Sequence, residues 1–492
     1  MKKILCVAAA VIFVLTCFAL CGCSTDKLDK AAKNADDYTI VCSFDEETKQ
    51  LSATQTVKMT NRSDNSFDCV KFHIYANQYR EDAQRCIVPN SYRSTAYPNG
   101  ASYGEICFDN VKVDDTAVAY RIEGDDMDIL SVPLSKELFP DEQITVEMTY
   151  VIKLANILHR LGYAQNTVNL GNFYPVLCHI ENGNYVCSPY YNTGDPFVSD
   201  VANYTVTITA PQNYLVASSG ELNSASANGN YSTYEYYGPA RRDFAMVLSD
   251  KYKKISETCG NTQINYYYYN DTSPEASLAT ATGMFKMLCE KVGNYPYKQY
   301  TVCETDFCYG GMEYSCLSMV TSGSNSYKEA VAHETAHQWF YGLVGNDQIA
   351  NAWMDEGLAE FLTHVYLDKT GEKPLQTFVL ANTKTYTTYV DVLNRYYENA
   401  DTSFKSLDKY KNDSEYVIMT YVKGSLLFNT LYETMGETKF FKALAKYFDQ
   451  TEFCLASPQE MSQCFATVGG AETATIIDNF RLGKEIIGKV TD

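Results

Sequence analysis

His333-Glu334-Thr335-Ala336-His337 is the stretch that decides the fold of the second half of this chain. It has the pattern H-E-x-x-H. Positions i and i+4 of an α-helix lie on one face, so a helix here places both imidazoles beside one metal ion. Glu334 is then positioned to act on a water molecule bound to that metal. The chain has only six histidines in 492 residues, so a chance match is rare. The alternative is a solvated helix face with two unrelated histidines.

A catalytic zinc ion needs a third protein ligand and one open position for water. Glu356, within residues 353–360, is the candidate. Eighteen residues separate it from His337, which is enough for one helix to end and a second to return antiparallel. Two imidazoles with one carboxylate suit zinc well. We therefore expect one Zn²⁺ per chain, held by His333, His337 and Glu356.

Several segments together resemble the aminopeptidase N family of zinc metallopeptidases, gluzincins with a thermolysin-like catalytic domain. Glu356 lies in a W-x-x-E-G context, as in that family. Gly310-Gly311-Met312-Glu313-Tyr314 resembles its G-x-M-E-N motif, with Tyr314 in place of asparagine. Tyr421-Val422-Lys423-Gly424 resembles its Y-x-K-G segment. Residues 170–175 and 242–245 resemble landmarks of its N-terminal β domain.

The resemblance implies a role for each matched residue. Glu334 would act as general base and Tyr421 would donate its hydroxyl to the oxyanion. Glu313 would pair with the free α-ammonium of the substrate, which makes the enzyme an exopeptidase. Glu360, four residues after Glu356, would accept the spare ring N–H of a zinc histidine. The substrate-binding residues are expected to be Gly310, Gly311, Met312 and Glu313.

The family also has an amine contact in its β domain, and Gln165 or Asn166 falls near that place. Well-known relatives continue into a large C-terminal helical domain. This sequence ends at Asp492, so we expect that domain to be missing and the cleft to be more open.

The N-terminus has the pattern of a targeting segment. Lys2 and Lys3 precede an apolar run over residues 4–20, which is short for a membrane span. Residues 20–23 resemble a bacterial lipobox. We therefore expect a lipoprotein signal peptide at residues 1–22, a lipid anchor at Cys23 on the outer face of the cell membrane, and a polar tether over residues 23–37. The alternative is a plain secretory signal.

Hydrophobicity patterns predict a multidomain α+β protein. Residues 38–253 show strand-like alternation, which favours an antiparallel β-sandwich or saddle. Residues 254–492 are mostly helical and would form the thermolysin-like peptidase domain. Ser273-Pro274 is a typical helix start. Further helices are expected at residues 329–341, 352–367, 424–435, 438–448 and 458–468, and strands at residues 300–303 and 312–320.

Composition limits the function classes. Hydrophobic residues make up 46% of the chain and charged residues 20%, as in globular proteins. The formal net charge of −20 argues against nucleic-acid binding. Four of the 17 cysteines lie in the leader, and the spacing of the other thirteen assigns no disulfide pairs.

The sequence therefore predicts a zinc-dependent aminopeptidase that removes N-terminal residues from peptides outside the cell. Two alternatives stay open at this point. One is an endopeptidase or narrow processing metallopeptidase with an open cleft. The other is a non-catalytic surface binding protein.

Overall fold

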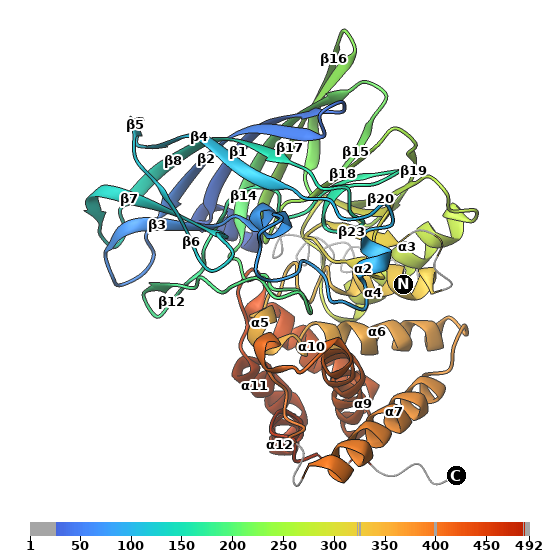
Figure 1. Ribbon diagram of the computed structural model, residues 1–492. Coiled ribbons are helices and arrows are strands. Elements are labelled where there is room, and N and C mark those ends of the chain that lie inside the picture. The colour runs from blue at the N-terminus through green and yellow to red at the C-terminus, as the bar shows by residue number, and fades with distance from the viewer. Residues whose placement is uncertain (1–25, 322, 324–325, 398–400, 486, 488–492) are drawn as a thin grey trace, which may run out of the picture.

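The computed structural model describes residues 26–321, 323, 326–397, 401–485 and 487 (Figure 1). The predicted signal peptide at residues 1–22 and Cys23 lie outside the described residues. Among the described residues, no helix has the length and apolar character needed to cross a membrane. All thirteen cysteines in this part of the chain are free thiols.

The first half of the chain is a β domain built on an eight-stranded sheet. Side chains of its central strands alternate between buried and exposed, the pattern that predicted them. All neighbouring strands are antiparallel except β1 and β14, which pair in parallel. In spatial order the strands are β16 (Glu221–Asn228), β17 (Tyr231–Arg241), β14 (Ala202–Pro211), β1 (Asp36–Asp45), β2 (Gln50–Thr60), β8 (Gln143–Lys153), β4 (Glu105–Val113) and β5 (Thr116–Ala117).

Smaller sheets pack against this one and share its hydrophobic core. The first has the order β15 (Leu215–Ser218), β18 (Met246–Ser249), β10 (Val168–Leu170) and β9 (Leu161–Tyr163). The second has the order β11 (Val176–Leu177), β3 (Phe67–His73), β7 (Ile129–Leu138) and β6 (Arg121–Glu123). A hairpin of β12 (Ile180–Glu181) and β13 (Asn184–Tyr185), the 3₁₀ turn η1 (Tyr75–Tyr79) and the short helix α2 (Arg93–Ala96) complete the domain.

The second half begins with a five-stranded mixed sheet and continues as helices. The sheet has the order β19 (Lys253–Cys259), β20 (Thr262–Tyr268), β21 (Gln299–Thr305), β23 (Leu317–Thr321) and β22 (Gly311–Met312), so β22 is an edge strand. The helices are α3 (Pro274–Lys291), α4 (Tyr327–Ala336), α5 (Gln348–Asn351), α6 (Glu356–Lys369), α7 (Leu375–Tyr396), α8 (Asp413–Val417), α9 (Gly424–Met435), α10 (Glu437–Thr451), α11 (Pro458–Gly469) and α12 (Ala471–Arg481).

Figure 1 shows the β domain above the helices, with α4 and α6 running along the junction between them. The expected α+β class, a β domain followed by a mostly helical domain, is confirmed. Helix α9 has the predicted bounds, whereas α7 and α12 were not predicted. Apolar residues of α7 recur at helical spacing: Tyr386 is buried in the core of the helical half, and Leu375, Val379, Tyr389 and Val390 pack partly buried against that core. Pro274 begins α3 as expected, but the Ser273 side chain makes no capping hydrogen bond.

Two predicted helices are shorter than expected. Helix α4 ends at Ala336 because the chain tightens there, with the N–H groups of Gln338 and Trp339 donating to carbonyls three residues back. Helix α6 starts at Glu356 rather than at residue 352.

The expected polar tether at residues 23–37 is wrong for its described part. Residues 26–34 are helical, and β1 begins at Asp36. Lys27 forms ion pairs with Asp449 (2.6 Å) and Glu452 (2.5 Å) at the end of α10. The side chain of Asn203 in β14 donates to the carbonyl of Ala32 (2.8 Å). Partners on both domains therefore hold this segment in place.

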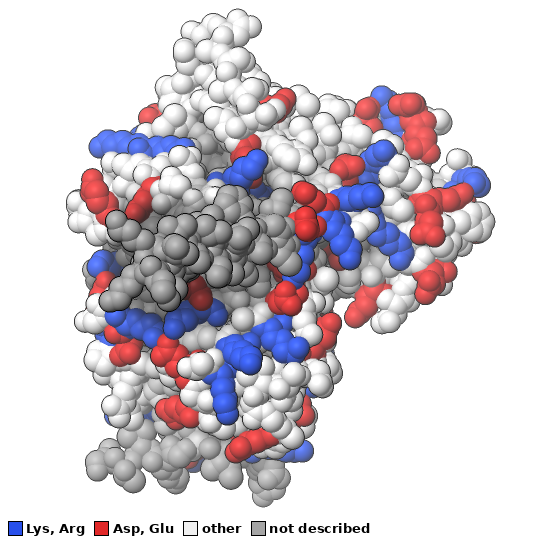
Figure 2. Space-filling model, turned by 180° about the vertical axis from the view of Figure 1, so that it is seen from behind, with Lys and Arg blue, Asp and Glu red and all other residues white. Residues whose placement is uncertain are grey.

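Surface charges are mixed. Figure 2 shows Lys and Arg side chains interspersed with Asp and Glu over the rear face, and few charges on the hairpin of β16 and β17 that projects at the top.

Arg242 joins the two domains. It is buried, and its guanidinium donates to the carbonyls of Tyr341 (2.8 Å), Ser199 (2.8 Å) and Cys454 (3.0 Å). The next residue, Asp243, accepts hydrogen bonds from the Ser315 amide and the Tyr341 hydroxyl. The segment that resembled a family landmark is thus an interdomain contact.

Replacing Arg242 by methionine should lower the free energy of unfolding by roughly 3 kcal/mol, because several buried carbonyls lose their donor. Urea denaturation followed by circular dichroism measures this change. The control is Arg93→Met, since Arg93 is exposed on α2. Equal stability of the two variants would contradict the assigned role.

Candidate active site

The three predicted zinc ligands converge at the junction of α4 and α6. His333 lies on α4, His337 directly follows it, and Glu356 is the first residue of α6. The Oε2 of Glu356 is 3.1 Å from the Nε2 of His333 and 3.2 Å from the Nε2 of His337. The two Nε2 atoms are 3.0 Å apart. His337 and Glu356 are buried.

These donor atoms fit a zinc ion. Tetrahedral ligands at about 2.05 Å from zinc lie roughly 3.3 Å from one another. The observed separations are only a few tenths of an ångström shorter. All three donor atoms face one point, and two nitrogens with one oxygen form the ligand set of catalytic zinc.

A second layer of acceptors orients both histidines. The Nδ1 of His337 lies 3.1 Å from the carbonyl of Phe340. The Nδ1 of His333 lies 3.3 Å from Glu360, whose other oxygen is 3.5 Å from His364. An acceptor on Nδ1 keeps the proton there and leaves Nε2 free to bind metal.

Glu334 lies against Gly311. A Cβ atom on Gly311 would come within 2.3 Å of Glu334 Oε1, so only glycine leaves room for this carboxylate. Its other oxygen, Oε2, is buried without a hydrogen-bond partner in the described structure. Before the charge of a metal ion is added, burial raises the pKa of Glu334 to about 7. This is the range that a general base needs.

Tyr421 reaches the metal centre from a π-helical segment, Ile418–Lys423, between α8 and α9. Its ring stacks on His333, with ring centroids 6.0 Å apart. Burial, with Glu356 nearby, raises the pKa of Tyr421 well above its usual value, so the hydroxyl remains a donor. Gly424 ends this segment and touches Gly357, where an added Cβ would come within 2.8 Å of the Gly357 Cα atom.

A cavity of about 310 Å³ opens over the metal centre. Glu313 is buried there and accepts a hydrogen bond from Gln348 (2.9 Å). Desolvation by burial raises the pKa of Glu313 well above its usual value, and the nearby carboxylate of Asp195 adds to this shift. Gly310 and Gly311 line the cavity beside it, on and next to the edge strand β22. Met312, which was also expected to bind substrate, does not line the cavity. Its sulfur accepts a hydrogen bond from Arg160 (3.1 Å).

Tyr314, the departure from the resembled motif, joins the substrate segment to the β domain. Its hydroxyl donates to Asn172 (2.8 Å) and lies in the space that Gly171 leaves, where a Cβ would come within 2.0 Å of it. Residues 170–175 and 310–314 are therefore parts of one contact.

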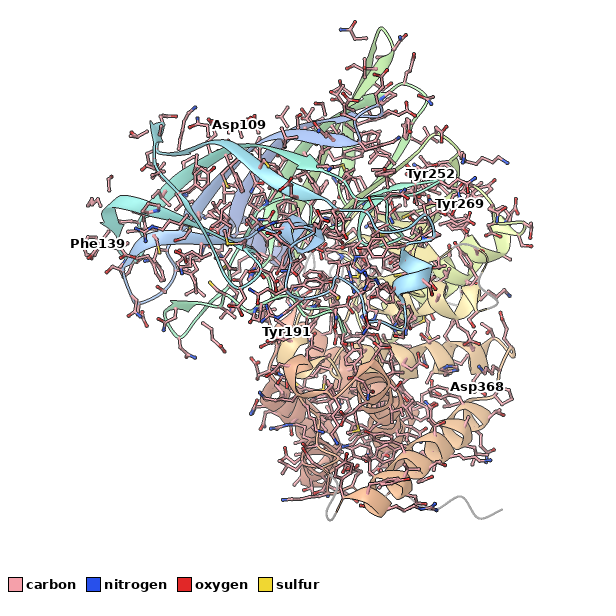
Figure 3. The ribbon with its side chains drawn as sticks, in the orientation of Figure 1. Asp109, Phe139, Tyr191, Tyr252, Tyr269 and Asp368 are labelled. Carbon is pink, nitrogen blue, oxygen red and sulfur yellow. The ribbon has the colours of Figure 1, made fainter. Side chains whose placement is uncertain are left out.

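Several residues that line the cavity were not identified from the sequence, and they include Arg160, Asp195 and Tyr416. Arg160 and Asp195 lie in loops of the β domain, where no spacing or periodicity marks them. Asn166, a suggested amine contact, instead bonds to Asp306 and does not line the cavity. Tyr416 and Tyr421 belong to a small cluster with Tyr191, which Figure 3 labels where the β domain meets the helices.

Comparison with known proteins agrees with this geometry. Residues 277–480 match the model of the Peptidase family M1 domain. Leukotriene A-4 hydrolase of Xenopus laevis is 29% identical over 180 residues, which cover 34% of this chain and 28% of that protein. Aminopeptidase N of Haemonchus contortus is 23% identical over 365 residues, which cover 68% of this chain and 36% of that protein. The chain thus spans about a third of the length of these relatives.

A solved structure matches over nearly its whole length. The M1 zinc metallopeptidase from Deinococcus radiodurans has a TM-score of 0.67 and 16% identity, covering 92% of this chain and 94% of that one. At this identity the likeness shows the fold. The domain match and the three-ligand cluster together indicate a zinc metallopeptidase, and the M1 family implies a catalytic zinc ion.

Glu360→Gln should weaken zinc binding by about 10- to 100-fold, because His333 loses the charged acceptor that orients it. Competition with a chelator measures the zinc dissociation constant. Glu329→Gln is the matched control, since Glu329 lines the same cavity but pairs with Lys373 instead. Unchanged affinity in the Glu360 variant would contradict its role as an orienting group.

Proposed function

We propose that this protein is an aminopeptidase that hydrolyses the first peptide bond of substrates with a free N-terminus. The observation that carries the proposal is the placement of Glu313. This buried carboxylate lies in the same cavity as the metal ligands and accepts a hydrogen bond from the neutral amide of Gln348. A substrate ammonium supplies the missing positive charge, whereas an internal peptide segment does not. The Deinococcus relative also has a mutant structure with a bound Tyr-Ser-Ala substrate.

Each residue of the cavity has a separate role in the proposed reaction. A zinc ion held by His333, His337 and Glu356 would lower the pKa of a water molecule and polarise the scissile carbonyl. Glu334 accepts the proton of the attacking water and delivers it to the leaving amine. Tyr421 donates its hydroxyl to the carbonyl oxygen as negative charge develops there. The edge strand β22 offers unpaired backbone groups along which a peptide can lie.

We further propose that the protein acts outside the cell, attached to the membrane through a lipid on Cys23. The support is the basic, apolar and Cys-containing order of residues 1–23.

Glu334→Gln should lower kcat by at least about 10²-fold while zinc stays bound, because the carboxylate is not a ligand. Tyr421→Phe should lower kcat by about 10²- to 10³-fold with little change in KM. Hydrolysis of amino-acid p-nitroanilides measures kcat and KM, and metal analysis measures the zinc bound to each variant. The control is Tyr432→Phe, because this substitution removes a hydroxyl group that lies on α9 and bonds to Glu437, away from the cavity. Full activity in the Glu334 variant would overturn the mechanism.

N-terminal acetylation of a peptide should abolish its cleavage, because the acetylated nitrogen carries no charge for Glu313. The same peptide with a free N-terminus is the reference, and mass spectrometry of the products measures both. Equal cleavage of the two peptides, or cuts far from the N-terminus, would show an endopeptidase instead.

A further inference from the structure

Two cysteines face each other at the base of the hairpin formed by β12 and β13, whose first strand is labelled in Figure 1. The Sγ atoms of Cys178 and Cys187 are 3.9 Å apart. Cys178 is buried, whereas Cys187 is partly exposed. Neither residue lines the cavity over the metal centre, so the proposed peptide hydrolysis does not use them.

The two-residue turn Asn182-Gly183 sets this pairing. Both residues have positive φ angles, 50° and 73°, as a type I′ hairpin turn requires. The short ladder of β12 and β13 follows the turn. Beyond that ladder the Val186 N–H donates to the carbonyl of His179 (2.7 Å). The next pair outward in the same register is Cys178 and Cys187.

This position in the ladder suits a disulfide. Because His179 and Val186 form a hydrogen-bonded pair, the next pair is of the non-hydrogen-bonded kind, whose Cα atoms lie about 4.5 Å apart. Disulfides span Cα separations of about 4.4–6.8 Å. The two sulfur atoms have to approach from 3.9 Å to about 2.05 Å, and side-chain rotation provides this change while the strands stay in register.

Cys187 is the more reactive of the two thiols. It lines an open pocket of about 480 Å³ together with Lys71, so a molecule in solvent can reach its sulfur. The hydrogen bond with Cys178 and the charge of Lys71 lower the pKa of Cys187, which raises the fraction of reactive thiolate. Burial raises the pKa of Cys178 well above its usual value, so this residue stays a thiol.

We propose that Cys178 and Cys187 are a site of reversible disulfide formation that closes the base of the hairpin. The oxidant is a low-molecular-weight disulfide of the glutathione type, which enters the open pocket and meets Cys187 first. The buried Cys178 then completes the bridge. This site is independent of the aminopeptidase function proposed above.

The bridge forms in two exchange steps. The Cys187 thiolate attacks one sulfur of the oxidant, the S–S bond of the oxidant breaks, and one thiolate leaves and takes up a proton. The Cys178 thiol then loses its proton and attacks the Cys187 sulfur of the mixed disulfide, which releases the second thiolate. The protein loses two electrons and two protons, and the oxidant becomes two thiols.

The bridge holds a segment that leads to the active-site cavity. Residues 188–195 follow Cys187 directly, and Asn192, Gly194 and Asp195 line that cavity. On the other side, Cys178 follows β11, which pairs with β3 in the core of the β domain. A covalent link between the two cysteines therefore anchors the start of residues 188–195 to this sheet.

Thiol trapping tests the disulfide on the full chain. The protein is equilibrated with mixtures of reduced and oxidised glutathione, blocked with N-ethylmaleimide, and cleaved after glutamate, which cuts at Glu181 between the two cysteines. Mass spectrometry should find the two peptides joined by one disulfide. Cys178→Ser should leave Cys187 carrying glutathione, whereas Cys187→Ser should leave Cys178 unmodified. In the matched control Cys69→Ser, which removes a thiol from the neighbouring strand β3, the bridge should still form.

Oxidation should raise the melting temperature of the wild type by roughly 5 °C, because the bridge restricts the unfolded chain. The melting temperature of Cys187→Ser should not respond to the glutathione ratio. Differential scanning fluorimetry measures both proteins.

Four outcomes would overturn the proposal. Alkylation of both thiols at every glutathione ratio means that no bridge forms. A bridge from Cys187 to Cys69 means that the hairpin register does not select the partner. Equal amounts of glutathione on Cys187 in the wild type and in Cys178→Ser mean that Cys178 does not complete the exchange. Equal melting temperatures of the oxidised and reduced wild type mean that the bridge anchors nothing.

Discussion

The energy of buried carboxylates is the constraint on which the structure depends. Asp195, Glu313, Glu334, Glu356 and Glu360 lie close together at the domain junction, where an uncompensated charge costs several kcal/mol. Two histidines with their metal ion and one buried arginine offset most of this charge. The carboxylates that remain favour a ligand with a positive charge.

The two domains contribute differently to this centre. Every metal ligand and the residues that orient it belong to the helical half, on α4 and α6 or directly beside them. Arg160 and Asp195 come from the β domain, and Arg242, Asp243 and Tyr314 fix that domain against the peptidase domain. The packing of two helices therefore positions the metal ligands, whereas residues of both domains line the cavity.

Local patterns were enough to predict the metal ligands, because the spacing of His333 and His337 follows from helix geometry and Glu356 is a short distance away. They also predicted the alternating strands of the large sheet. Asp195 and Arg160 could not be found in this way, since loops bring them to the cavity from far along the chain. Helix α7 was missed although its sequence carries apolar residues at helical spacing that pack against the core. The helix at residues 26–34 was missed because partners on two distant segments hold it.

The contact between Gly357 and Gly424 determines the spacing of two residues of the site. Side-chain contacts leave room for rotamer changes, but here two backbones touch directly. Glu356 precedes one glycine, and Tyr421 lies three residues before the other. The spacing of Glu356 and Tyr421 therefore depends on the van der Waals contact of main-chain atoms. Any side chain at either glycine would force the two backbones apart and change the distance between these two residues.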